Sequence, residues 1–230
     1  MLVFLVASVV VGLLAVVYAR AFSLSEHVAL WVLARHPVFF FFYVPLLFLA
    51  SVALCRYLAP RAAGGGPEHV IAALRHLGQD PTDSERLKPY LGGRVIGIKA
   101  ISSLVTAAGG GALGREGPTI QITAGIFSIM GRRLRRYFPH VDLRAWIVAG
   151  SAAGLAAAFN TPLGGVVYAI EELTDLHISR LGSYLFLAVV CAGLTALSLN
   201  GSYLLFGGRA VRWSHSPREF AATLLLGLVC

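Results

Sequence analysis

The sequence predicts an all-α integral membrane protein with several helices, some of them broken or re-entrant. Three observations predict this fold class. Hydrophobic residues make up 57% of the 230 residues and charged residues only 13%, about half the charge of an average soluble domain. The charged residues lie in short intervals between long uncharged runs. Glycine and proline interrupt two of these runs near the middle, which is typical of the broken helices of membrane transporters.

The first uncharged run covers residues 1–19, close to the roughly 20 residues that a helix needs to cross a bilayer. A cleaved signal peptide is the alternative, because Ala19-Arg20-Ala21 fits a cleavage site. The run lacks a basic start and is longer than the apolar part of a usual signal peptide. The sequence therefore favours a retained helix, with a polar interval after it at residues 23–27.

A second run, residues 38–55, follows a polar break at residues 35–37. Its four phenylalanines at 39–42 are interpreted as lipid contacts, and Pro45 predicts a kink. Residues 79–94 form the most polar interval and predict a solvated loop. Lys99, at the start of the next helix, is expected to reach toward the membrane interface.

Between these runs, three glycines and a proline precede a short helix predicted at residues 69–77; they are Gly64, Gly65, Gly66 and Pro67. A glycine backbone can approach an ion closely, and the N-terminus of the following helix would favour an anion. Taken alone, such a stretch is more often a flexible linker, so both interpretations stay open on the residues themselves.

The central break separates two uncharged flanks, residues 100–113 and 119–131, each too short to cross alone. Its residues are Gly114, Arg115, Glu116, Gly117 and Pro118. Arginine and glutamate are costly at membrane depth and usually mark a functional site there. Pro118 suits the first position of a new helix, whose free N–H groups would point back at the break and form an anion site.

A second broken helix is predicted at residues 145–170, interrupted at Asn160-Thr161-Pro162. Its first half consists largely of glycine and alanine, which lets helices approach closely in lipid. Glu171 and Glu172 follow it, and taken alone they are an acidic helix end in water. Residues 181–208 contain a further span, 209–218 a polar turn, and 220–230 the start of an apolar segment.

Three linked stretches resemble the CLC family of chloride channels and chloride/proton antiporters: residues 114–118, residues 150–165, and Ile170-Glu171-Glu172. By position, residues 63–67 resemble the family's Gly-Ser-Gly-Ile-Pro loop, with Gly64 where the serine lies. The resemblance implies a CLC-type fold in which residues 1–230 are the N-terminal half of the transport domain. That half would be the first of two inverted repeats, with the second missing or truncated.

The resemblance also implies a function, namely transmembrane chloride transport as a chloride/proton antiporter. Glu116 would be the gate and Glu172 would pass protons. The anion would be bound around Gly64, Gly65, Gly66, Pro67, Gly114, Arg115, Gly117 and Pro118, with Arg115 mainly holding its loop. The alternatives are a passive voltage- or pH-gated chloride channel and, more distantly, a membrane-embedded enzyme using Glu116 as a base. The expected partners are chloride or another small anion, protons, lipid, and a second copy packed through residues 163–170 and 181–199.

Other classes fit the sequence poorly. The net charge of +8 resides in short loops without interleaved aromatics, which argues against nucleic acid. The three cysteines and seven histidines show no metal-ligand spacing, so no metal or cofactor is expected, nor an enzyme. The arginines at 132, 133, 135 and 136 would draw anions toward a vestibule or bind lipid headgroups. The alanine- and arginine-rich composition with short loops indicates a bacterial inner membrane.

Overall fold

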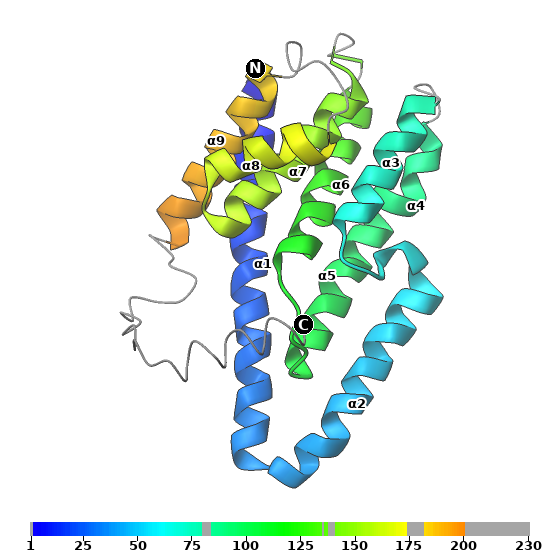
Figure 1. Ribbon diagram of the computed structural model, residues 1–230, viewed down its shortest axis with the longest axis vertical. Helices are drawn as coiled ribbons and strands as arrows, with labels where there is room; N and C mark the ends of the chain where they lie inside the picture. Colours follow the sequence, from blue (N-terminus) through cyan, green and yellow to red (C-terminus); the bar gives the residue numbers. More distant parts are fainter. Residues whose placement is uncertain (1, 80–83, 135, 138–140, 174–181, 201–230) are drawn as a thin grey trace, which may run out of the picture.

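The computed structural model describes residues 2–79, 84–134, 136–137, 141–173 and 182–200 (Figure 1). Within these ranges the chain forms helices and connecting loops and no strand, so the all-α prediction is confirmed. Three helices in the described part are long and apolar enough to cross a membrane: Leu5–Arg35, Pro37–Leu58 and Glu85–Ala108.

The first two helices form a long V in Figure 1. Helix α1, Leu2–Arg35, runs without interruption, so the predicted polar interval at 23–27 is wrong as a break. The reason is local, because its polar groups bond to the helix's own carbonyls. Ser25 Oγ donates to the Ala21 carbonyl at 3.0 Å, and His27 Nδ1 lies 2.7 Å from the Ser23 carbonyl. Side chains that bond back in this way do not end a helix.

Helix α2, Pro37–Ala53, continues into a π-helical turn η1, Leu54–Leu58. Pro45 lies inside α2 without ending it. Phe39, Phe41 and Phe42 are each more than half exposed, which agrees with their interpretation as lipid contacts.

The next part contains the short helices η2 (Pro60–Ala62), α3 (Pro67–Gln79), η3 (Ser84–Leu87) and α4 (Lys88–Leu91), then α5 (Gly93–Ala108). The solvated loop predicted at 79–94 is wrong over its second half. Leu87 and Leu91 are fully buried and Tyr90 is nearly so. These side chains pack against Val70 and Leu74 of α3. The turn residues of this segment suggested exposure, but burial of its apolar side chains holds it against α3.

Helices α6 (Glu116–Leu134), α7 (Leu143–Phe159), α8 (Pro162–Tyr168), η4 (Ala169–Leu173) and α9 (Gly182–Asn200) complete the described fold. The second break is confirmed: Asn160 ends α7 in the left-handed conformation, with φ 56°, and Pro162 opens α8. Helix α9 accounts for the span predicted at 181–208, while residues 201–230 lie outside the described part.

Small residues on α7 let it lie directly against α6, as predicted. A side chain at Gly150 would collide with Phe127, and one at Gly154 would collide with Thr123. Around this contact lies the main core, which includes Ile147 and Val148 of α7. Helix α6 is thereby held from both sides, by α7 and by α5, and its N-terminus is fixed at the centre of the molecule (Figure 1).

Candidate functional site

Helix α6 begins at Glu116, two residues before the start predicted at Pro118. The Arg115 carbonyl accepts from Thr119 N at 3.1 Å and from Thr119 Oγ1 at 2.7 Å, which closes the first turn earlier. Pro118 then falls within that turn, where a missing N–H leaves no bond unmade. Glu116 therefore stands in the first helical turn, where the helix dipole favours a negative charge.

The two glycine loops predicted separately from the sequence lie directly against each other. A side chain on Gly66 would collide with the Gly117 carbonyl, and one on Gly117 would collide with the Gly65 carbonyl. Gly66 also has φ +123°, which side-chain-bearing residues rarely adopt. Only glycine allows this backbone-to-backbone contact, and it joins the start of α3 to the start of α6.

This contact predicts the effect of a single methyl group. Gly117→Ala should destabilise the protein by about 1–3 kcal/mol, because the added carbon has to displace backbone. Gly97→Ala is the matched control, since a side chain at this helical glycine of α5 meets nothing within 4 Å. The control should be neutral or stabilising by up to about 1 kcal/mol. The measurement is thermal unfolding of both variants in detergent, and equal midpoints would contradict the contact.

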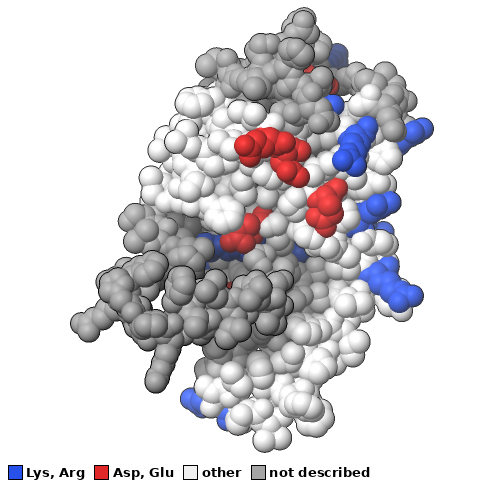
Figure 2. All heavy atoms as spheres, viewed as in Figure 1, with Lys and Arg blue, Asp and Glu red and all other residues white. Residues whose placement is uncertain are grey.

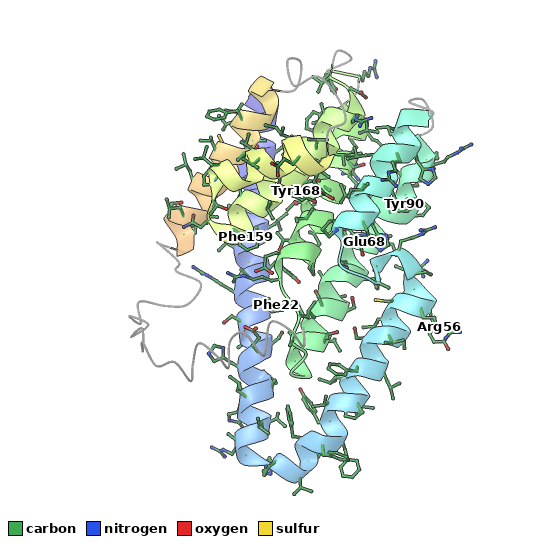
Figure 3. All side chains as sticks on the ribbon, in the orientation of Figure 1. Phe22, Arg56, Glu68, Tyr90, Phe159 and Tyr168 are labelled. Atoms are coloured by element: carbon green, nitrogen blue, oxygen red, sulfur yellow. The ribbon has the colours of Figure 1, made fainter. Side chains whose placement is uncertain are left out.

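The loop before α3 carries a carboxylate on its own N–H groups. Gly65 N donates to Glu68 Oε1 at 2.6 Å and Gly66 N donates to Glu68 Oε2 at 2.9 Å; Figure 3 shows Glu68 at the start of α3. Burial alone would raise the pKa of Glu68, but its own backbone N–H and those of Gly65 and Gly66 hold that pKa below its ordinary value. Two of the predicted anion-binding residues thus already hold an oxyanion group, supplied by the chain itself.

Lys99 is buried, only 3% exposed, so the expectation that it reaches the membrane interface is wrong. Its ammonium donates to the Gly64 carbonyl at 2.6 Å and to the Ala62 carbonyl at 3.1 Å. Carbonyl oxygens of the loop partly replace water around the charge, which makes its burial tolerable. A cation therefore lies beneath the first glycine loop, close to both predicted anion-binding stretches.

A cavity of about 430 Å³ connects Lys99 to both loops. Its polar lining comes from Ser51, Arg56, Lys99, Ser102, Ser103 and Thr106, and Gly64, Leu113 and Pro118 bring the two loops to it. Several hydroxyls are engaged with neighbours; for example, Thr106 Oγ1 donates to Ser51 Oγ at 2.8 Å. Most of the lining is apolar, but the hydroxyls and the two cations give the cavity one side suited to a small anion or water.

Glu116 is half-buried, and its carboxylate folds back over Gly114, where a side chain would collide with it. Glu116 and Arg115 both act electrostatically on the Tyr18 hydroxyl of α1. That hydroxyl lies 2.8 Å from Ser103 Oγ on α5. Glu116 therefore lies within electrostatic range of a hydroxyl that joins α1 to α5.

Gln121 lies one turn further along α6 and hydrogen-bonds to the backbone of two neighbouring segments. It is fully buried, and its Nε2 donates to the Arg61 carbonyl at 3.0 Å and to the Tyr90 carbonyl at 3.1 Å. These bonds tie η2 and α4 to α6. The short elements around the first loop are thus positioned relative to the central helix by a single side chain.

Glu172 lies apart from this centre, exposed in the π-helical turn η4. Both Glu172 and Glu68 act electrostatically on Tyr168, whose buried hydroxyl has no hydrogen-bond partner in the part of the chain that the structure describes. Figure 2 shows acidic side chains gathered at mid-height on one face, while basic ones follow the edge formed by α3, α4 and the end of α2. Glu172 and Glu68 therefore both lie within electrostatic range of one buried hydroxyl.

Half-helices and glycine loops that meet beside a buried charge are recurring features of secondary transporters in membranes. A family model described as the voltage gated chloride channel matches residues 46–230. The chain therefore belongs to this family, the CLC family, and is an integral membrane protein, as predicted.

Known relatives agree with this assignment. The chain is similar to proteins named H(+)/Cl(-) exchange transporter ClcA, with 30% identity to that of Citrobacter koseri and 31% to that of Salmonella arizonae. Each match covers 85% of this chain and 41% of the relative. A crystal structure of a slow cyanobacterial Cl⁻/H⁺ antiporter matches with a TM-score of 0.65 and 26% identity, over 98% of this chain and 53% of that one. The chain thus spans about two fifths of the length of these curated relatives.

Sequence reasoning missed Lys99, Glu68 and Tyr168 as parts of this region. One signal was present: Lys99, Ser102, Ser103 and Thr106 recur at the spacing of one helical face in an otherwise apolar segment. Such a polar stripe inside a membrane helix indicates an internal cavity rather than lipid.

Proposed function

We propose that this chain is part of a chloride/proton antiporter in which Glu116 is the gate. The single observation that supports the proposal is the direct contact between the two glycine loops, because it brings Gly65 and Gly66 beside Gly117, the residue that follows Glu116. The names of the relatives support exchange over passive conduction.

The chemistry is a competition between two anions. An ionised Glu116 occupies the positive end of α6 and excludes chloride from it, because both prefer the same N–H groups. Protonation makes the side chain neutral, so it leaves and the anion enters. Each exchange therefore couples the passage of an anion to the movement of a proton.

We assign the anion site to Gly64, Gly65, Gly66, Pro67, Gly114, Gly117 and Pro118, with Arg115 holding the loop. The Glu68 carboxylate on the N–H groups of Gly65 and Gly66 supports this assignment, since it shows that the loop can accommodate negative charge. Gly64 has φ +85°, a conformation that suits glycine. Without a hydroxyl at this position, the anion relies on backbone N–H groups.

A passive chloride channel is the second candidate. The position of Glu172 favours the antiporter, because an exposed carboxylate that acts on a buried hydroxyl is suited to receive protons from water. Halide efflux from liposomes containing the complete protein tests transport itself. Efflux well above that of protein-free liposomes is expected, and its absence would contradict the proposal.

We further propose that residues 1–230 are the first of two inverted repeats, in a bacterial inner membrane and surrounded by lipid. The complete protein would form a homodimer in which α8 and α9 face the second copy. Supporting this, Leu163, Val167 and Leu194 are each about half or more exposed. Apolar side chains on a short broken helix and its neighbour form a surface that a second copy can cover.

Crosslinking tests this dimer. Leu163→Cys or Leu194→Cys in the complete protein should give covalent dimers in membranes after mild oxidation, because these side chains would meet their counterparts. Phe41→Cys is the control: Phe41 is 75% exposed but lies on the predicted lipid face of α2. Dimers from the control as abundant as those from the α8 and α9 positions would exclude this interface.

A further inference from the structure

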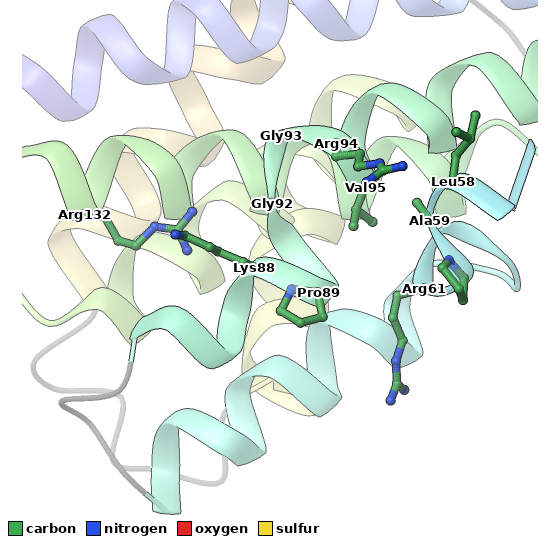
Figure 4. A pocket seen from close by; sticks show the side chains of 11 residues that line it. Leu58, Ala59, Arg61, Lys88, Pro89, Gly92, Gly93, Arg94, Val95 and Arg132 are labelled. Carbon is green, nitrogen blue, oxygen red and sulfur yellow. The ribbon is translucent and has the colours of Figure 1, made fainter. Parts of the chain in front are cut away.

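A second cavity, of about 660 Å³, lies away from both glycine loops (Figure 4). It is enclosed by the end of η1, the turn η2, α4, the start of α5 and the C-terminal part of α6. Its lining is Leu58, Ala59, Pro60, Arg61, Lys88, Pro89, Gly92, Gly93, Arg94, Val95 and Arg132. None of these residues belongs to the candidate anion site at 64–67 and 114–118.

Four of the eleven lining residues are cationic and none is acidic. The cations come from four separate elements: Arg61 from η2, Lys88 from α4, Arg94 from α5 and Arg132 from α6. Lys88 has a partner outside the lining, with its Nζ 2.5 Å from Glu85 Oε2. Glu85 also acts electrostatically on Arg132. Even with this one acid counted, the cations around the cavity remain in excess.

Arg132 provides the most specific evidence. Its Nη1 is buried and has no hydrogen-bond partner in the part of the chain that the structure describes. A buried N–H without an acceptor is costly, whereas a guanidinium is well matched to two oxygens of one phosphate. An oxyanion with several acceptor oxygens would satisfy this N–H group.

The cavity also lies where two candidate membrane spans end. Leu58 is the last residue of the span Pro37–Leu58, and Lys88 lies close to the start of the span Glu85–Ala108. Basic side chains near the ends of apolar helices attract the headgroups of anionic lipids. Apolar lining from Leu58 and Val95 lies beside the cations, which suits a ligand with a charged head and an apolar tail.

We propose that this cavity binds a phosphate group, supplied by the headgroup of an anionic phospholipid. Arg132 holds the phosphate oxygens, and the acyl chains lie along Leu58 and Val95. The site contains none of the residues assigned to the anion site and does not depend on the function proposed above.

The test uses the complete protein in detergent with phosphatidylglycerol or phosphatidylcholine added, and native mass spectrometry to count retained lipid. The wild-type protein should retain phosphatidylglycerol preferentially. Arg132→Gln should lower that retention about fivefold or more, the effect of one cation near a headgroup. Arg133→Gln is the matched control, because Arg133 is exposed and does not line the cavity. Arg94→Gln repeats the test at an exposed residue whose loss leaves the core intact.

Several outcomes are decisive. Equal losses in the Arg132 and Arg133 variants, or equal retention of the two lipids by the wild-type protein, would overturn the site. Displacement of phosphatidylglycerol by millimolar inorganic phosphate would retain the phosphate site but overturn the lipid as its source. Halide efflux from the same variants separates this proposal from the transport function, since Arg132→Gln should leave efflux unchanged.

Discussion

The complete protein carrying Glu116→Gln is expected to pass chloride without moving protons. Glutamine has nearly the size of glutamic acid but cannot ionise, so it imitates the protonated gate at every pH. It does not compete with chloride for the N–H groups at the start of α6, and it carries no proton across the site. Both the coupling and the pH dependence of chloride flux should therefore be lost together.

Paired chloride and proton fluxes in liposomes, across a range of pH, measure this effect. Glu26→Gln is the control, since Glu26 is an exposed carboxylate on α1 and lies outside the candidate site. It should behave as wild type. Stoichiometric coupling with the normal pH dependence in the Glu116 variant would place the gate at another residue.

Glu172→Ala is expected to abolish proton movement while chloride movement continues. Glu172 is exposed in η4 and is not one of the proposed anion-binding residues, so its removal should leave the anion site unchanged while taking away the carboxylate proposed to receive protons from water. The effect should be specific to this position. Glu171, its exposed neighbour in η4, provides a matched control of the same chemistry.

The measurement is proton uptake driven by a chloride gradient, compared between Glu172→Ala and Glu171→Ala. Full uptake is expected in the second and none in the first. If the Glu172 variant still moved protons uphill, that residue would be only a solvated helix end, as its exposure alone would suggest.

Most of the fold could be predicted because membrane helices follow local rules. The sequence itself contains the features that predict these helices: the lengths of the uncharged runs, the break at Asn160-Thr161-Pro162 and the GREGP stretch at 114–118. The failures arose where tertiary contacts outweigh local signals. Residues 23–27 stayed helical because their polar groups bond within α1, and residues around Tyr90 were buried by packing on α3.

The sequence predicts which stretches form the candidate site, but it does not predict how those stretches contact one another. Composition indicates that Gly66 and Gly117 each lie in a loop; it does not indicate that each excludes a side chain on the other. The position of Lys99 was mispredicted for the same reason. A lysine near the start of an apolar helix usually reaches water, and only the fold reveals the carbonyl oxygens that hold Lys99 inside.

The central claim is that the complete protein exchanges chloride for protons. The most direct test reconstitutes it in liposomes and imposes a chloride gradient with no pH gradient. The account predicts that protons move uphill, in the direction opposite to chloride, and that the movement stops when the chloride gradient is removed. Chloride flux accompanied by no proton movement beyond that set by the membrane potential would contradict exchange and identify a passive channel.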